Sequence, residues 1–152
     1  MVTEIDSFKI IGIKIRTTNE NNKAVSDLSN LWGKFFSENL IAKIPQKISS
    51  EIYCIYTEYE SDYTKPYTAI IGCKVENLDV IPEGMVGKTI EKGSYKKFIT
   101  NGSLSKGIVF KKWSEIWNSK LKRRYSADFE VYGEKAQNPE DAEVEIYVSV
   151  KE

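Results

Sequence analysis

The residues of this chain that could do chemistry are carboxylates, phenols and lysines, because the sequence contains no histidine. Without an imidazole, Ser-His-Asp and Cys-His nucleophile pairs, HExxH metal sites and histidine general bases are excluded. The two cysteines, Cys54 and Cys73, are too few to complete a four-ligand zinc site. We therefore expect no metal and no cofactor, and we expect both cysteines to be free thiols that pack as small buried residues.

Glutamate and tyrosine alternate along two predicted strands near the C-terminus, at 128–134 and 143–150. In the first strand Glu130 and Tyr132 share one face, and in the second Glu145 and Tyr147 do. Simple hairpin pairing around the turn at 138–139 sets Tyr132 opposite Glu145 and Glu130 opposite Tyr147. The aliphatic faces are expected to pack under helices, so this pattern predicts a cluster of two carboxylates and two phenols on the face away from the helices.

Such a cluster suits a cation. A desolvated carboxylate attracts positive charge, and each neighbouring ring adds a cation-π contact of about 0.5–2 kcal/mol. The pattern leaves two interpretations open, because the same residues could form a solvated outer face with no binding role.

Hydrophobic periodicity divides the chain into two similar halves, and the order of elements predicts an α+β fold. The expected elements are a strand at 8–15, a helix at about 22–40, strands at 51–57 and 67–75, an extended segment at 86–100, a helix from about 103, and strands at 128–134 and 143–150. This order indicates a duplicated strand-helix-strand-strand (βαββ) unit with pseudo-twofold symmetry, antiparallel sheets and helices on one side. We expect one domain over residues 1–152, with repeats at about 1–80 and 81–152.

Tryptophans lie on the apolar faces of both predicted helices. Trp32 and Trp113 occupy equivalent positions when the halves are aligned, which supports a duplication, and both are expected in the core. Trp117 lies at the edge of its apolar stripe, near the predicted groove, and is a candidate wall residue.

The charge of the chain is balanced, with 22 basic and 22 acidic residues, so we expect no direct contact with nucleic acid. The basic run at 120–124 is interpreted as a complement to the dipole at the end of the second helix. The N-terminus does not resemble a secretion signal, and no apolar run approaches the roughly 20 residues that span a bilayer. The expected location is the cytoplasm, with no membrane insertion.

Several short strings, in order and spacing together, resemble the stand-alone effector-binding proteins of the GyrI-like superfamily, notably the integron-cassette type. The strings are Phe8–Gly12, Arg16–Asn19, Leu31–Phe35, Ile55–Asp62, Tyr67–Val75, Tyr95–Phe98, Trp113, Asp128–Tyr132 and Glu145–Tyr147. The resemblance covers nearly the whole chain. It implies a duplicated βαββ fold with a ligand groove between the repeats, of the sort that serves as the drug-sensing domain of multidrug-responsive transcription activators.

In that superfamily a groove glutamate faces cationic amphipathic ligands between aromatic walls. The resemblance places this glutamate at Glu130, with Glu145 as a second candidate. The predicted ligand-binding set is completed by Tyr56, Tyr95, Tyr132, Tyr147 and Trp117. We therefore expect a binding module for a small organic molecule, cationic or aromatic, related to the sensing domains of transcription regulators. We expect it to lack a DNA-binding domain, so a separate regulator protein is an expected partner.

Two alternatives from other classes stay open. Some superfamily members look able to hydrolyse strained, electrophilic small molecules; here Glu130 would activate water and Tyr95 or Tyr132 would donate a proton, and turnover would distinguish this enzyme from a binding module. Other relatives modulate DNA gyrase, a role for which an acidic outer surface would be the sign. The balanced charge of both halves gives little support to that interaction role.

Overall fold

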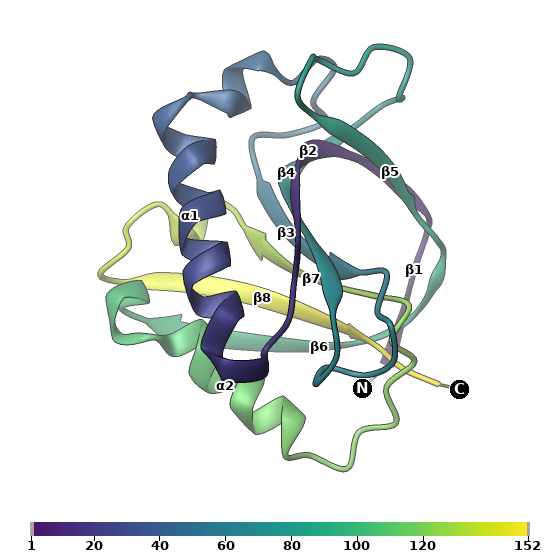
Figure 1. Ribbon diagram of the computed structural model, residues 1–152, viewed down its shortest axis with the longest axis vertical. Coiled ribbons are helices and arrows are strands. Elements are labelled where there is room, and N and C mark those ends of the chain that lie inside the picture. The colour runs from purple at the N-terminus through teal and green to yellow at the C-terminus, as the bar shows by residue number, and fades with distance from the viewer. Residues whose placement is uncertain (1, 152) are drawn as a thin grey trace.

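The computed structural model describes residues 2–151, and within them eight strands and two helices form an α+β fold (Figure 1). The strands are β1 (Val2–Ile5), β2 (Phe8–Thr17), β3 (Ile52–Thr57), β4 (Tyr67–Val75), β5 (Val86–Ile90), β6 (Gly93–Gly102), β7 (Ala127–Tyr132) and β8 (Ala142–Ser149). The helices are α1 (Lys23–Ser37) and α2 (Ile108–Trp117), and short 3₁₀ turns occur at Glu20–Asn22, Leu40–Lys43, Leu104–Lys106 and Glu134–Ala136. The α+β class predicted from the sequence is confirmed.

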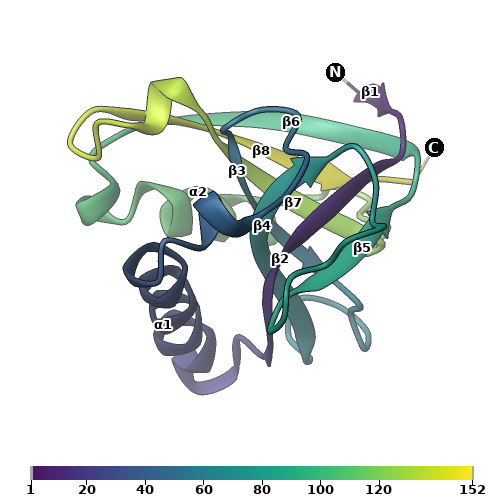
Figure 2. The ribbon, with the colours of Figure 1, turned by 90° about the horizontal axis from the view of Figure 1, so that it is seen from above.

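All eight strands belong to one antiparallel sheet in the order β1-β6-β8-β7-β3-β4-β2-β5. The sheet is strongly curled, and both helices lie on the same side of it, as Figure 2 shows from above. The prediction that the helices share one side is confirmed. The expectation of separate antiparallel sheets is corrected, because β3 pairs with β7 at the centre and joins the two halves.

The curled sheet has apolar side chains on both faces. Along β4, Ile70 packs inside the curl, whereas Ile71 and Cys73 pack on the side covered by α1. Both faces are therefore buried, which explains why β4 is an almost continuous run of apolar and β-branched residues. Cys54 and Cys73 are free and buried, as predicted.

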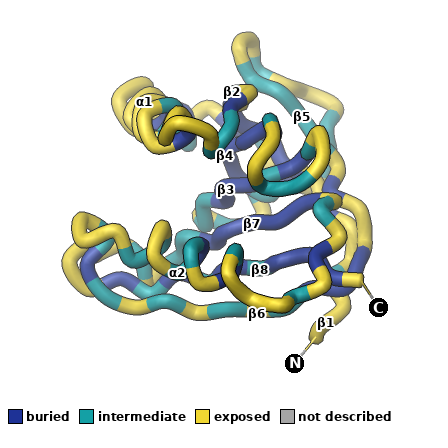
Figure 3. The backbone as a smooth tube through the Cα atoms, turned by 60° about the horizontal axis from the view of Figure 1, so that its bottom comes forward, coloured by how far each residue is buried: buried dark blue, intermediate teal, exposed yellow. Residues whose placement is uncertain are grey.

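Each helix buries one apolar stripe on the sheet. Helix α1 packs Leu31 and Phe35 over β2 and β4, and α2 packs Trp113 and Ile116 over β8. Helix α2 begins later than the predicted 103, because a 3₁₀ turn and Gly107, at a φ of 71°, precede its first residue. In Figure 3 the two helices run along the same side of the strands with a gap between them.

The N-terminal part of each half extends the sheet in a way that the periodicity did not predict. Strand β1 pairs with β6, in the other half of the chain, and β5 pairs with β2. The predicted extended segment at 86–100 is thus two strands, which lie far apart in the strand order. Within residues 2–151, neither helix is long and apolar enough to cross a membrane.

The hairpin of β7 and β8 differs in register from the prediction by one residue. Glu130 pairs with Ile146 and Phe129 pairs with Tyr147, whereas the sequence predicted Glu130 opposite Tyr147. Because side chains alternate, a shift of one residue moves a strand's side chains to the other face. The 3₁₀ turn at Glu134–Ala136 lies in the connection and shifts its centre.

The shift separates the predicted cluster of carboxylates and phenols. Glu130 and Tyr132 lie on the helix side of the sheet, together with the aliphatic residues of β8 that pack under α2. Glu145 and Tyr147 lie on the opposite side. The prediction that all four share a face away from the helices was wrong, because the interior of the curl buries the apolar face of β7 and leaves its polar face to the helices.

Candidate functional site

A cavity of about 620 Å³ lies between the two helices and the sheet. Its walls are mainly aromatic and aliphatic, and they include Trp32 of α1 and Trp113 and Trp117 of α2. Tyr56 of β3 and Glu130 of β7 lie at its floor, where the two halves of the sheet meet. This volume is within the range typical of sites for drug-sized molecules.

Glu130 is 1% exposed and accepts three hydrogen bonds. The hydroxyl of Tyr56 donates to Oε2 at 2.8 Å, and the indole Nε1 of Trp113 donates to the same atom at 2.7 Å. The hydroxyl of Tyr132 donates to Oε1 at 2.7 Å. One donor therefore comes from β3, one from β7 and one from α2, and all three are neutral.

The environment of Glu130 acts on its charge in two opposite ways. Burial raises the pKa of Glu130 because it disfavours the charged form. The hydrogen bonds from Tyr132, Tyr56 and Trp113 favour the anion and oppose that rise. Among residues 2–151, no lysine or arginine forms an ion pair with this carboxylate. The carboxylate is thus solvated by dipoles without a counter-charge.

Asp128, two residues earlier on the same strand, is also completely buried but is held differently. It forms an ion pair with Arg123 at 2.7 Å, and its other donors are the hydroxyl of Tyr59 and the backbone N–H and hydroxyl of Ser149. The interpretation of the run at 120–124 as a helix cap is therefore corrected for Arg123: α2 ends at Trp117, and the Arg123 side chain is only 4% exposed. Asp128 has its own cation, and Glu130 does not.

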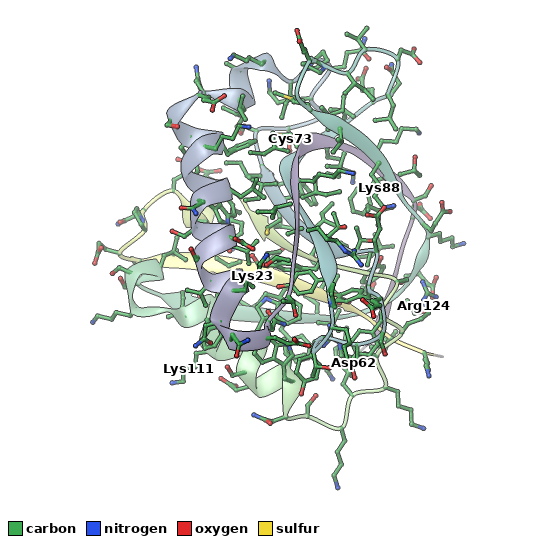
Figure 4. All side chains as sticks on the ribbon, in the orientation of Figure 1. Lys23, Asp62, Cys73, Lys88, Lys111 and Arg124 are labelled. Carbon is green, nitrogen blue, oxygen red and sulfur yellow. The ribbon has the colours of Figure 1, made fainter. Side chains whose placement is uncertain are left out.

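Aromatic contacts hold the walls of the cavity. Trp113 packs edge-on against Tyr56 at 5.6 Å between ring centroids, and Trp32 packs edge-on against Tyr132 at 4.9 Å. Trp117 is stacked on Tyr63 at 5.1 Å with 5° between the ring planes. Tyr63 belongs to the loop between β3 and β4; Asp62 of that loop and Lys111 of α2 both lie in the lower part of Figure 4. The stack therefore joins the end of α2 to this loop.

Four of the seven predicted ligand-binding residues line this cavity: Glu130, Tyr132, Tyr56 and Trp117. The other three lie elsewhere, on the opposite face of the sheet.

Glu145 and Tyr147 line a smaller hollow of about 270 Å³. There Glu145 forms an ion pair with Lys97 at 3.1 Å and accepts a hydrogen bond from Tyr147 at 3.1 Å. Tyr95 is buried inside the curl, 5.3 Å from the ring of Phe129. Of the two proton donors considered for the hydrolase alternative, Tyr95 is therefore separated from Glu130, whereas Tyr132 donates a hydrogen bond to it at 2.7 Å.

The sequence reasoning missed two functional candidates. Trp113 is buried as expected for a core residue, but its indole N–H also donates to Glu130. A buried tryptophan needs an acceptor for this group, which was a signal that a polar partner lay beneath the helix. Arg123 also lines the cavity, although nothing in a basic run on a predicted surface indicated its burial.

Comparisons with known proteins agree with this architecture. A family model described as integron-associated effector binding protein matches residues 1–150. An integron cassette protein from the mobile metagenome of Vibrio cholerae, VCH_CASS2, is 31% identical, with a TM-score of 0.77 over 99% of this chain and 95% of that one. YobU of Bacillus subtilis (strain 168), named as a candidate transcriptional regulator, is 27% identical over 99% of this chain and 96% of its own. The structure of SAV2435 bound to tetraphenylphosphonium has a TM-score of 0.81 at 20% identity, over 99% of this chain and 93% of that one.

Proposed function

This chain belongs to the family of integron-associated effector-binding proteins, and we propose that the cavity between its helices binds a small organic cation. The observation that carries the proposal is the state of Glu130, a buried carboxylate with three neutral donors and no cation among the described residues. A buried charge without a partner is costly to the fold, whereas a bound cation would compensate it.

The hydrogen bonds of Glu130 favour one type of cation. A carboxylate offers about four lone-pair positions, and Tyr56, Trp113 and Tyr132 already occupy three of them. A primary ammonium group has three N–H donors, all of which are hydrogen-bonded to water before it binds. In the cavity it would find at most one free lone-pair position on Glu130. A quaternary ammonium or phosphonium ion has no N–H donor to satisfy, so it loses no hydrogen bond on entering the cavity.

The walls favour the same ligand. Trp32, Trp113 and Trp117 present large aromatic surfaces to the cavity, and such rings attract cations through their faces and pack well against apolar substituents. The ligand class that fits is a lipophilic cation carrying aromatic or alkyl groups. Tetraphenylphosphonium, which is bound in the structure of SAV2435, is a suitable probe of this class.

The test is a calorimetric titration of the protein with tetraphenylphosphonium, using wild type, Glu130→Gln and Glu145→Gln. The glutamine at 130 keeps the hydrogen bonds, since its oxygen can accept from Trp113 and its amide can donate to Tyr132. The affinity of Glu130→Gln for tetraphenylphosphonium should be about tenfold or more below that of wild type, because an attraction between buried opposite charges is lost. Glu145→Gln removes an equal charge on the other side of the sheet and should bind as wild type does. Equal affinities in wild type and Glu130→Gln would refute the proposal.

We also infer that residues 1–152 form one effector-binding domain made of two repeats, at about 1–80 and 81–152. The inference is supported by the order strand-helix-strand-strand, which occurs as β2-α1-β3-β4 and again as β6-α2-β7-β8. It is supported further by an exchange of aromatic contacts, since Trp32 packs on Tyr132 and Trp113 packs on Tyr56. Trp32 and Trp113 thus each contact a strand tyrosine of the other half.

A further inference from the structure

Arg123 has hydrogen-bond donors that nothing in the described part of the chain uses. Its Nη2 bonds to Asp128, but its Nε and Nη1 are buried and have no partner within residues 2–151. The side chain is 4% exposed and belongs to the lining of the same cavity as Glu130. Leaving a buried charged donor without an acceptor is costly, so two such atoms at the edge of a cavity point to a group that arrives with a ligand.

The surroundings of Arg123 leave two nitrogens of its guanidinium group for that purpose. The ring of Tyr125 lies 4.3 Å from the guanidinium carbon, and the ring of Trp113 lies 5.6 Å from it. These rings pack on the group, and Asp128 takes the Nη2 side. Nε and Nη1 are left. Their N–H groups point to different sides of the planar guanidinium group, so each can donate to an oxygen acceptor of its own.

We propose that the free donors of Arg123, Nε–H and Nη1–H, form a second binding subsite, in which one of them donates to a neutral oxygen acceptor of the ligand, such as a ketone or amide carbonyl. The proposal rests on the proposed function of the same cavity. A neutral acceptor fits better than a carboxylate because Asp128 already compensates the charge of Arg123. Trp113 contacts Arg123 with its ring face and Glu130 with its indole N–H, so the acceptor and the cationic centre both lie beside one indole. The ligand class is therefore an aryl cation that carries a carbonyl group.

Four compounds test the two subsites separately. Two are cations, para-acetylphenyl-trimethylammonium and para-isopropylphenyl-trimethylammonium, and two are their neutral counterparts, acetophenone and cumene. Within each pair a carbonyl oxygen is replaced by a methyl group of similar size. Affinities are measured by NMR titration of the tryptophan indole N–H signals in wild type, Arg123→Lys and Glu130→Gln.

In wild type the acetyl compound of each pair should bind about tenfold more tightly than its isopropyl counterpart, as expected for a hydrogen bond to a charged donor. Arg123→Lys keeps a cation beside Asp128 but removes the free Nε and Nη1 donors, so this preference should disappear. Glu130→Gln should weaken both cations and leave the preference for the acetyl compound unchanged.

Equal affinities for acetyl and isopropyl compounds in wild type, or an unchanged preference in Arg123→Lys, would overturn the inference while leaving the cation site intact. A different result would refute the proposed function: the two cations would bind no more tightly than the two neutral compounds. In that case acetophenone and cumene still decide whether Arg123 binds an acceptor.

Discussion

Replacing Arg123 by methionine should destabilise the fold by about 3 kcal/mol, because the substitution leaves the buried carboxylate of Asp128 without its cation. Removing one partner of a buried pair typically costs about 3–5 kcal/mol. The lower end applies here, since Asp128 keeps three donors: the hydroxyl of Tyr59 and the N–H and hydroxyl of Ser149. For a domain of this length, such a loss lowers Tm by about 6–12 °C.

The double variant Arg123→Met with Asp128→Asn is the matched control. Asparagine is neutral and isosteric, its oxygen can accept from Ser149, and its amide can donate to Tyr59. It should recover about 2 kcal/mol of the loss, since the uncompensated charge is gone. Urea denaturation followed by circular dichroism measures both variants. A loss below about 1 kcal/mol for Arg123→Met, or a double variant less stable than the single one, would contradict a buried ion pair at this position.

Three further predictions concern Glu130, Gly72 of the sheet and Gly33 of helix α1. Burial raises the pKa of Glu130 above its unfolded value, so the folded state binds the proton more readily. As pH falls through that pKa toward the unfolded value, wild type should gain stability relative to Glu130→Gln, by at most about 1.4 kcal/mol per pH unit in urea titrations. Over the same range it should lose affinity for tetraphenylphosphonium, because Glu130 becomes neutral. Gly72→Ala should cost about 3 kcal/mol or more, because the new Cβ would lie 2.1 Å from the carbonyl oxygen of Ile11. Gly33→Ala, with no atom within 4 Å of the new Cβ, should instead stabilise α1 by up to about 1 kcal/mol in the same assay.

The helices and strands of this fold could be predicted from the sequence where one pattern of hydrophobic residues dominates a segment. The apolar stripe of α1 and the β-branched run of β4 gave both elements nearly at their observed bounds, Lys23–Ser37 and Tyr67–Val75. The strand at Val2–Ile5 was missed because it is short and mostly exposed, so burial leaves no alternation in it. Its place beside β6 depends on a pairing between distant segments, which local periodicity does not contain.

The face of Glu130 could not be predicted for a different reason. Alternation separates the two faces of β7, but both faces are buried, one inside the curl and one under the helices. Assigning Phe129 and Val131 to the helix side assumed a sheet with one buried face. The family resemblance predicted Glu130 as the groove carboxylate, while the environment of Glu130 followed from the curl of the sheet.

The position of Glu130 also explains why the site holds one negative charge. Cys54 of β3 pairs directly with Glu130 of β7, where the two halves of the sheet meet. The sequence offset that matches Tyr56 to Tyr132 also makes Cys54 the counterpart of Glu130 in the first half. A carboxylate at both positions would place like charges side by side, and one of them would stay protonated. Burial raises the pKa of the Cys54 thiol and keeps it neutral, so a single anion lies between two tyrosine hydroxyls, one from each half. The cation that we propose as ligand is therefore monovalent, because a divalent cation would overcompensate a single negative charge.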